Sequence, residues 1–468
     1  MSLYIDRINE KLFRLVDVQY LGAWEMEYDT LKAYLSLISL IKKQTGSSPK
    51  NFGTYNFSPY NVPVGLKLEE EHEKLLKEVK NAGLPFFLEY SGVKVCKNLE
   101  DFKYGIINPP SLSIEPISIC NYRCSWCYGD SQNKPKTTRL DENSFFEQIL
   151  KPGLKLGTLS WYIAGGEPNI NPDHTLKILG HILTQTRKEL GEMPIIALST
   201  NGYNSAELMD AYFKNGVTTV QFSLSSRFPD KDAILRGVPK GVNSVEEVAL
   251  GIIKAKKLGM RTVINCLIVP EHKDKPANVS DIPQMIRFAQ QLGVDMLRFT
   301  PPVPVGAALV NKIYPTIKFM RQVSQLINEY AGKNKRQLRA SCTVVINGIH
   351  HQASREQDTS IDFPVFCRAG TTFLYITANG DAYPCNNVIP DFCVDNTQRT
   401  PLDIIWKESK ILNRWRQDNK ACKECGICRV RFECVGMCRA LCWARYRQLD
   451  LCQKPNTCEY EQQLDEGF

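Results

Sequence analysis

SICNYRCSWCYGD, residues 118–130, places three cysteines within eight consecutive positions. Cys120, Cys124 and Cys127 are separated by three residues and then by two. Three thiolates on one loop can ligate three irons of a [4Fe-4S] cluster and leave the fourth iron open to a ligand from outside the protein. A zinc ion held by three cysteines and a histidine is one alternative, and cysteines that bind no metal are another. The nearest downstream histidine, His174, has no second histidine at zinc-site spacing, which favours the cluster.

Around this loop, from about residue 110 to 332, short apolar runs alternate with helical stretches. The runs are SLSIEPISI, LSWYIAGG, PIIALSTNG, TTVQFSLSS, RTVINCLIV and DMLRFTPP, and the helical stretches include NSVEEVALGIIKAKKLG. Six strands that are each followed by a helix predict parallel strands joined by right-handed crossovers, closed or partly closed into a barrel. In such a barrel the functional residues lie at the C-terminal ends of the strands. The cysteine loop follows the first strand, so it is expected at that end.

The chain has 468 residues, more than one hydrophobic core usually supports, so several domains are expected. We predict an N-terminal extension at 1–108, the α/β barrel at 109–335 and a cysteine-rich domain at 336–468. An amphipathic repeat at 68–82 predicts that the extension is mainly helical. The extension carries no recognisable chemistry, and holding a peptide is one role for it.

Composition predicts a cytoplasmic protein. The N-terminus lacks the regions of a signal peptide, and apolar stretches such as YLSLISLI are too short to span a bilayer. The net charge of +8 is spread among mixed Lys, Arg and Glu, so we expect neither nucleic acid nor membrane as a partner. Seventeen cysteines in such a chain favour metal binding over disulfides.

The spacing C-x3-C-x2-C after the first strand of a βα barrel, with an aromatic residue before the last cysteine, resembles the radical S-adenosylmethionine (SAM) enzymes. The resemblance implies that the open iron is chelated by the amino and carboxylate groups of SAM. One electron from the cluster then splits the sulfonium and gives a 5'-deoxyadenosyl radical. Cys120, Cys124 and Cys127 would accordingly be both metal ligands and catalytic residues, and Tyr122 and Trp126 would lie against the cofactor.

Other strand ends extend the resemblance. AGGEP ends the second strand, STNG the third and FSLSS the fourth, and Arg236 in ILRG matches an arginine that reaches the SAM carboxylate. The alternatives are an ordinary strand-end turn for AGGEP and a solvated surface arginine for Arg236. The family commonly has an aspartate where Ser225 or Ser226 stands, which leaves that contact unassigned. The SAM-binding residues implied by the resemblance are Gly165, Gly166, Glu167, Pro168, Ser199, Asn201, Ser223 and Arg236.

The C-terminal cysteines resemble the SPASM domain, which carries two auxiliary iron-sulfur clusters; a structural zinc ribbon is the alternative. The ligands implied for the first auxiliary cluster are Cys367, Cys385 and Cys438. Those implied for the second are Cys425, Cys428, Cys434 and Cys458. Residues 355–366 contain no further cysteine, so the first auxiliary cluster is expected to have an open iron or a borrowed ligand. Cys452 is an alternative to Cys458 as a ligand. Cys422 and Cys442 are either inert buried thiols, or one of them ligates the incomplete cluster or donates a hydrogen atom or thiolate to the substrate; Cys442 is our candidate for a catalytic thiol, and Cys393 has no assigned role.

Together these resemblances imply an oxidoreductase with three [4Fe-4S] clusters and SAM that acts in RiPP biosynthesis. It would abstract hydrogen from a residue of a ribosomally synthesised precursor peptide, leading to crosslinking, epimerisation or backbone excision. An external electron donor such as flavodoxin or ferredoxin would be a second partner. A small-molecule substrate in cofactor or natural-product biosynthesis is the alternative. An anaerobic sulfatase maturase is less favoured, because those enzymes have an aspartate base where Asn386 stands, and an amide cannot take the proton.

Overall fold

The structure is a computed structural model. It describes residues 3–7, 12–17 and 22–27, residues 111–330 with short gaps, and residues 369–417 with short gaps. The predicted domain boundaries at 108/109 and 335/336 lie outside the described residues and stay predictions.

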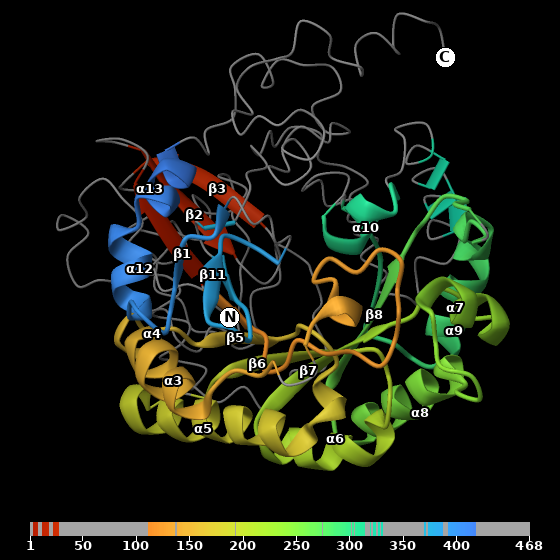
Figure 1. The fold of residues 1–468 in the computed structure, drawn as a ribbon, viewed down its shortest axis with the longest axis horizontal. Coiled ribbons are helices and arrows are strands. Elements are labelled where there is room, and N and C mark those ends of the chain that lie inside the picture. Colours follow the sequence, from red (N-terminus) through yellow and green to blue (C-terminus); the bar gives the residue numbers. More distant parts are fainter. Residues whose placement is uncertain are drawn as a thin grey trace, which may run out of the picture.

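Six parallel strands form the centre of the molecule (Figure 1). They are β4 (Ser111–Ile114), β5 (Ser160–Ile163), β6 (Ile195–Thr200), β7 (Val217–Ser223), β8 (Arg261–Leu267) and β9 (Met296–Thr300). Each strand pairs with the next in chain order, so the sheet runs from β4 to β9 without a change of direction. The sheet and its covering helices confirm the predicted partial (β/α)6 barrel.

Helices connect these strands on the convex side of the sheet, as Figure 1 shows for α5, α6 and α8. The α-helices are α3 (Glu142–Ser144), α4 (Lys151–Lys155), α5 (Pro172–Leu190), α6 (Ser205–Lys214), α7 (Pro229–Arg236), α8 (Ser244–Lys257), α9 (Ile282–Gln291) and α10 (Gly306–Val310). Short 3-10 or π turns occur at η2 (Ser131–Asn133), η3 (Phe145–Leu150), η4 (Pro168–Ile170) and η5 (Val279–Asp281).

Local sequence explains where helix α8 begins and ends. The Asn243 side chain accepts a hydrogen bond from the Glu246 N–H, which caps the first turn. Glutamates in the first turn and lysines in the last complement the helix dipole. The apolar face that remains packs on the sheet, with Val248 and Ile252 fully buried.

The main core lies between the sheet and the helices. Each barrel strand contributes a fully buried side chain to this core: Leu112, Trp161, Leu198, Phe222, Ile264 and Leu297. Successive side chains on a strand point to opposite faces, so their neighbours along each strand face the lumen of the barrel. The lumen therefore receives a separate and more polar set of side chains.

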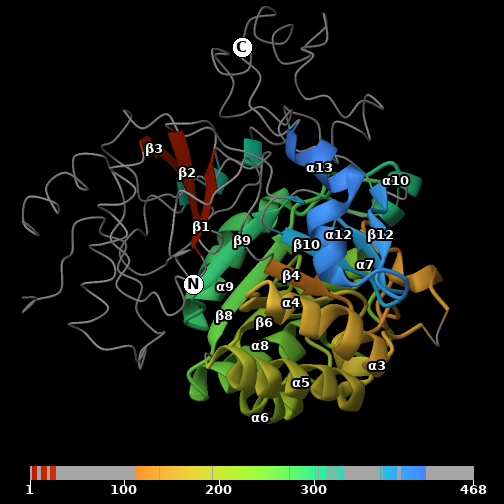
Figure 2. The same ribbon diagram turned by 90° about the vertical axis from the view of Figure 1, so that its left-hand side faces the viewer.

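The same sheet continues into the C-terminal region. Strand β10 (Phe373–Ile376) pairs in parallel with β4, β11 (Asp381–Tyr383) pairs antiparallel with β10, and β12 (Asp395–Asn396) completes the nine-stranded sheet. Helices α12 (Leu402–Glu408) and α13 (Lys410–Gln417) follow. Figure 2 shows α12 beside α4, and the two are joined by an ion pair of 3.0 Å between Lys155 Nζ and Asp403 Oδ2.

The described part of the N-terminal extension differs from the prediction. It is an antiparallel sheet of β1 (Leu3–Arg7), β2 (Leu12–Asp17) and β3 (Gly22–Glu27), where the sequence was expected to be mainly helical. Short apolar runs separated by short connections form a meander, and this local pattern overrides the helix-favouring composition. The repeat at 68–82, on which the helical prediction rested, lies outside the described residues.

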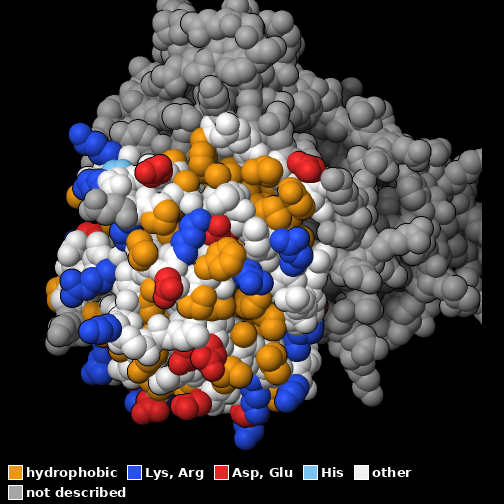
Figure 3. Space-filling model, turned by 90° about the vertical axis from the view of Figure 1, so that its right-hand side faces the viewer, with side chains coloured by type: hydrophobic (Ala, Val, Ile, Leu, Met, Phe, Trp, Pro, Cys, Tyr) orange, Lys and Arg blue, Asp and Glu red, His pale blue; other side chains and the backbone are white. Residues whose placement is uncertain are grey.

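Figure 3 shows the face of the molecule on the right of Figure 1. Exposed apolar side chains lie on it among basic and acidic ones, so both signs of charge are interspersed. In the described part of the chain, no helix is long and apolar enough to cross a membrane.

Candidate active site

The cysteine loop follows β4 and is held by the ends of two helices. The Arg123 N–H donates to the carbonyls of Arg236 and Gly237, at 3.1 Å each, and so ties the loop to the end of α7. The Cys127 carbonyl accepts from the Ala307 N–H at 2.9 Å, which ties it to the start of α10. At Gly237, where φ is 59°, a Cβ would lie 2.6 Å from the Arg123 carbonyl oxygen, so only glycine fits. Backbone contacts with both helices therefore hold the loop at the rim of the barrel.

The three thiols have surroundings that suit an iron-sulfur cluster. Cys120 Sγ lies 3.4 Å from the Tyr122 N–H and 3.7 Å from Asn201 Nδ2. Amide donors directed at cysteine sulfur are among the features that set the properties of iron-sulfur sites. Burial raises the pKa of the Cys120 thiol and raises that of Cys124 to about 12, whereas coordination to a metal ion deprotonates a thiol. Among the described residues, no three His, Cys, Asp or Glu side chains are grouped as for a single metal ion.

The two glycines of AGGEP pack against the backbone that leads into Cys120. The Gly166 N–H donates to Ile117 O at 3.0 Å, and the Glu167 N–H donates to Ile119 O at 2.7 Å. A Cβ on Gly166 would overlap with the Ile119 carbonyl. The glycines are thus required first for contact within the chain, whereas the sequence suggested contact with a ligand.

Glu167 joins the end of β5 to the end of β6. Its side chain is 1% exposed, and its Oε1 accepts from the Asn169 N–H at 3.0 Å and from the Thr200 hydroxyl at 2.8 Å. Its Oε2 accepts from the Asn201 N–H at 2.6 Å. Burial raises the pKa of Glu167 to about 7, although these hydrogen bonds oppose the rise. The carboxylate therefore positions Asn201, whose amide reaches Cys120.

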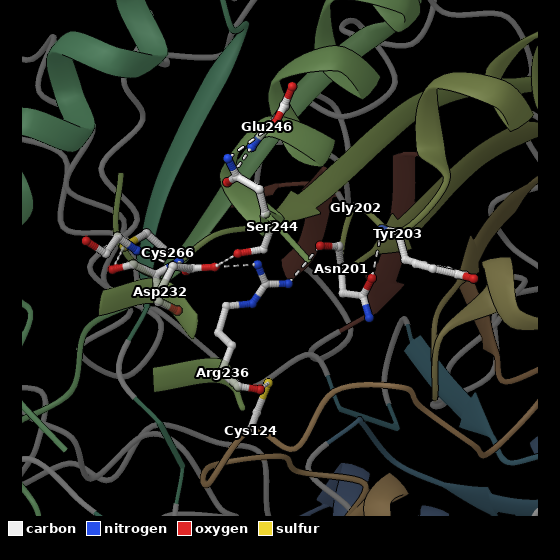
Figure 4. Close-up of polar contacts among 12 residues, drawn as sticks. Cys124, Asn201, Gly202, Tyr203, Asp232, Arg236, Ser244, Glu246 and Cys266 are labelled. Atoms are coloured by element: carbon white, nitrogen blue, oxygen red, sulfur yellow. Dashed lines mark hydrogen bonds and ion pairs between the residues drawn. The ribbon is translucent and has the colours of Figure 1, made fainter. Parts of the chain in front are cut away.

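Arg236 is the central buried cation of the site (Figure 4). It is 1% exposed, which contradicts the alternative of a solvated surface arginine. Its Nη2 donates to Asn201 O at 2.8 Å, its Nη1 pairs with Asp232 Oδ2 at 3.1 Å, and its guanidinium lies 4.9 Å from the centre of the Tyr122 ring. Asp232 also accepts from the Ser244 hydroxyl at 2.5 Å. Arg236 thus connects α7, the end of β6 and the cysteine loop.

Ser225 and Ser226 have a structural role at the end of β7. Their N–H groups donate to Asp232 Oδ1 at 2.8 and 3.2 Å, and the Ser226 hydroxyl donates to Asp281 Oδ2 at 2.6 Å. Asp232 is thereby held by both backbone and side-chain donors. Asp232 was not among the residues predicted from the sequence, although an aspartate four residues before Arg236 on one helix is a recognisable pairing signal.

The remaining predicted contact residues fall into two environments. Tyr122 is buried beside Arg236, and Ser199 faces the lumen, where it accepts a hydrogen bond of 3.4 Å from Gln221 Nε2. Ser223 ends β7, and Pro168 begins the η4 turn. Trp126 instead packs into a small apolar cluster, whose other buried members are Leu235, Val269, Ala308 and Ile313. Asn121, which the sequence analysis did not select, accepts from Asn201 Nδ2 at 2.7 Å.

Residues from β10 onward lie beside β4 at the rim of the barrel. Asn386 Nδ2 donates to the Ser113 hydroxyl at 3.1 Å, and the Tyr375 hydroxyl donates to the buried carboxylate of Glu115. The Tyr375 ring also meets the Tyr128 ring edge to face, with centroids 6.3 Å apart. The C-terminal region therefore supplies side chains next to the cysteine loop.

Of the predicted auxiliary-cluster ligands, Cys385 lies shortly after β11. The other predicted ligands and the candidate catalytic thiol lie outside the described residues: Cys367, Cys425, Cys428, Cys434, Cys438, Cys442 and Cys458. Their roles remain predictions.

Comparison with known proteins agrees with this arrangement. Residues 114–281 match the radical SAM superfamily, and residues 367–429 match the SPASM iron-sulfur cluster-binding domain. The AdoMet-dependent heme synthase of Methanosarcina barkeri is 22% identical over 348 residues, which is 72% of this chain and 93% of that protein. The PqqA peptide cyclase of Gluconobacter oxydans is 24% identical over 342 residues, 71% of this chain and 86% of that protein.

Solved structures show the same fold. SuiB of Streptococcus suis bound to S-adenosylmethionine has a TM-score of 0.59 at 16% identity and covers 96% of this chain and 98% of its own. The structure of anSMEcpe with bound AdoMet has a TM-score of 0.57 at 16% identity and covers 76% of this chain and 96% of its own.

A partial barrel with a three-cysteine loop at its C-terminal rim, together with the superfamily match, defines a SAM-dependent iron-sulfur enzyme. The chain is a radical SAM enzyme, and it carries a SPASM domain. Its cofactors are accordingly [4Fe-4S] clusters and SAM, as the sequence predicted.

Proposed function

We propose that this chain is a cytoplasmic enzyme that modifies a ribosomally synthesised precursor peptide. The modification begins with abstraction of a hydrogen atom from a C–H bond of one peptide residue, and it ends in crosslinking, epimerisation or backbone excision. An external donor such as flavodoxin or ferredoxin supplies the electrons. The PqqA peptide cyclase and the structure of anSMEcpe with a bound peptide support a peptide substrate.

The observation that carries the proposal is the composite rim of the barrel. Tyr375 and Asn386, which follow the barrel in sequence, contact Glu115 and Ser113 of its first strand region. The site is thus lined by residues of both the barrel and the region that matches the SPASM domain, and the PqqA peptide cyclase aligns with 71% of this chain. A substrate bound between SAM and an auxiliary cluster would contact residues from both regions.

The residues of this chain have distinct tasks in the proposed reaction. Cys120, Cys124 and Cys127 hold the cluster, and when bound, the cluster and SAM supply the radical that removes a hydrogen atom. Glu167 and Arg236 fix the Asn201 backbone from its N–H and its carbonyl side. The barrel lumen excludes water from the reacting groups.

Anaerobic incubation of the reconstituted full chain with SAM, dithionite and any short peptide found to be encoded beside its gene tests the proposal. Mass spectrometry should show one of three products. Loss of two hydrogens indicates a crosslink, gain of one deuterium from deuterated water indicates epimerisation, and loss of a backbone fragment indicates excision. Cleavage of SAM with an unchanged peptide would contradict a peptide substrate.

A small-molecule substrate is the second candidate, because the AdoMet-dependent heme synthase aligns over 93% of its own length. The two candidates differ in the genes expected beside this one and in whether a peptide changes the rate of SAM cleavage. A small-molecule enzyme would lie among biosynthetic genes without a short peptide gene, and peptide addition would leave its rate of SAM cleavage unchanged.

A further inference from the structure

A layer of polar side chains crosses the lumen of the barrel below the cysteine loop. Gln221 on β7 donates from Nε2 to the Tyr162 hydroxyl on β5 at 2.8 Å. Arg298 on β9 donates from Nη1 to Gln221 Oε1 at 3.1 Å, and so reaches across β8. The layer thereby connects β5 with β9 and ends in a guanidinium group.

Arg298 points into the lumen because its neighbours point the other way. Leu297 and Phe299 are 0% and 1% exposed and belong to the core between sheet and helices. Strand alternation therefore directs Arg298 to the opposite face, where its side chain is partly buried. Its Nε contacts Met296 Sδ at 3.2 Å.

Among the described residues, no carboxylate pairs with Arg298. Its recorded polar partners are the Gln221 amide and the Met296 sulfur, and neither carries a charge. Burial lowers the pKa of Arg298, and the positive charge of Arg261 lowers it further. Arg236 is the contrasting case, because that fully buried guanidinium has a paired carboxylate in Asp232. A desolvated cation without a counterion is costly, so its charge is expected to be balanced by a ligand.

The strand register places Arg298 near the predicted SAM contacts. Asn265 of β8 lies opposite Arg298 on one side and opposite Ser223, the last residue of β7, on the other. Gln221, which holds the guanidinium, lies two residues before Ser223, or about 7 Å deeper in the barrel. A group bound to Arg298 would therefore lie in the lumen just beneath the reacting end of the site.

We propose that Arg298 binds a carboxylate of the substrate, and this inference rests on the proposed peptide-modifying function. Arginine is suited to the task because its planar group can bind both carboxylate oxygens. The carboxylate comes either from an acidic side chain of the peptide or from its C-terminus. Holding it would place a neighbouring C–H bond at a fixed depth in the lumen.

Three small probes test the site without requiring any reaction. N-acetyl-glutamate amide carries only a side-chain carboxylate, N-acetyl-glutamine only a terminal one, and N-acetyl-glutamine amide neither. Reconstituted full chain with SAM is treated with phenylglyoxal in the presence of each probe, and labelling of each arginine is measured by peptide mass spectrometry. We expect a carboxylate probe to slow labelling of Arg298 severalfold, with the effective probe identifying the source of the carboxylate. Labelling of the exposed Arg287 should be the same in all samples.

A matched pair of variants makes the test specific. Arg298→Gln should weaken binding of the effective probe, measured by saturation-transfer NMR, by about tenfold or more, because a hydrogen bond to a charged group is lost. Arg287→Gln on α9 should leave that binding unchanged. Equal protection by all three probes, or none by any, would overturn the carboxylate site. If a carboxylate probe protects Arg298 but no peptide is modified, the proposed peptide-modifying function is refuted, whereas the carboxylate site is supported.

Discussion

Glu167 has a carboxylate in which every recorded hydrogen bond goes to the chain itself. The donors are the N–H groups of Asn169 and Asn201 and the hydroxyl of Thr200. The residue therefore fixes the backbone at the ends of two neighbouring strands, and its predicted contact with SAM stays a prediction. Because Asn201 in turn contacts Cys120, a single buried carboxylate connects two strand ends to the cluster loop.

Replacing this carboxylate with an amide should separate those strand ends. Glu167→Gln turns one acceptor oxygen into a donor that faces the Asn201 N–H, so a buried hydrogen bond is lost. We expect the free energy of unfolding to fall by about 1–3 kcal/mol, and SAM affinity, measured by calorimetry, to weaken in parallel.

Glu147→Gln is the control for this substitution. Glu147 is exposed and pairs only with Lys151 across one helical turn, so the same chemical change there should cost less than about 0.5 kcal/mol. Equal effects of the two substitutions would show that the buried contacts of Glu167 contribute nothing particular.

At this scale the sequence identified residues better than it identified their contacts. Cys120, Glu167, Asn201 and Arg236 were all selected, and the structure brings them together. Asp232 could have been found from its i,i+4 spacing to Arg236 on one helix, whereas the contact of Asn121 with Asn201 could not, because it joins residues 80 positions apart and depends on tertiary packing. Trp126 was placed beside the cofactor from its position in the motif; its ring packs into an apolar cluster against which Cys124 also packs, and its contact with the cofactor stays a prediction.

At the scale of elements, the end of β5 must lie directly against the loop that leads to Cys120. Gly166 makes this possible, because any side chain there would overlap with the Ile119 carbonyl. Gly191 ends helix α5 at a φ of 65° but has no atom within 4 Å of where a Cβ would stand. Substitutions at the two glycines can therefore be compared to distinguish the effect of close packing, at Gly166, from that of backbone conformation, at Gly191.

Gly166→Ala should displace the strand leading into the cysteine loop. We expect a loss of about 1–3 kcal/mol in unfolding free energy from overpacking, together with loss of SAM cleavage, because Cys120 directly follows Ile119. Gly191→Ala should cost only about 1 kcal/mol of left-handed strain and keep cleavage intact. Calorimetry and a chromatographic assay for 5'-deoxyadenosine measure the two effects. If the Gly166→Ala variant cleaved SAM at the normal rate, the close approach of the end of β5 to the cysteine loop would be contradicted.

Element types were predictable in the barrel, where short apolar runs alternate with helical stretches and this alternation identifies both, as for the six barrel strands and helix α8. They were misread at residues 3–27, where runs of five or six residues form strands. Short runs show too few turns for a helical period to be separated from a strand period. The pairing of β10 with β4 was also not predictable, since it joins segments separated by more than 250 residues.

At the scale of the whole molecule, one sheet carries both metal-binding regions. The Glu115 N–H donates to the Ile376 carbonyl at 2.9 Å, so the parallel pairing of β10 with β4 extends to the point where the cysteine loop begins. This pairing uses backbone groups and an apolar core, and it needs none of the three cysteine thiols. The C-terminal region should therefore stay attached and folded when the first cluster is absent.

The variant with Cys120, Cys124 and Cys127 all replaced by alanine tests this independence. With three [4Fe-4S] clusters the reconstituted chain should bind about twelve irons, and the variant about eight. It should lose all SAM cleavage but elute as the wild type does in size exclusion. Cys266→Ala, which removes a buried cysteine of β8, should keep the full iron content. Iron content near zero in the triple variant would mean that the regions fold as one metal-dependent unit, whereas retained cleavage would refute the assignment of the loop.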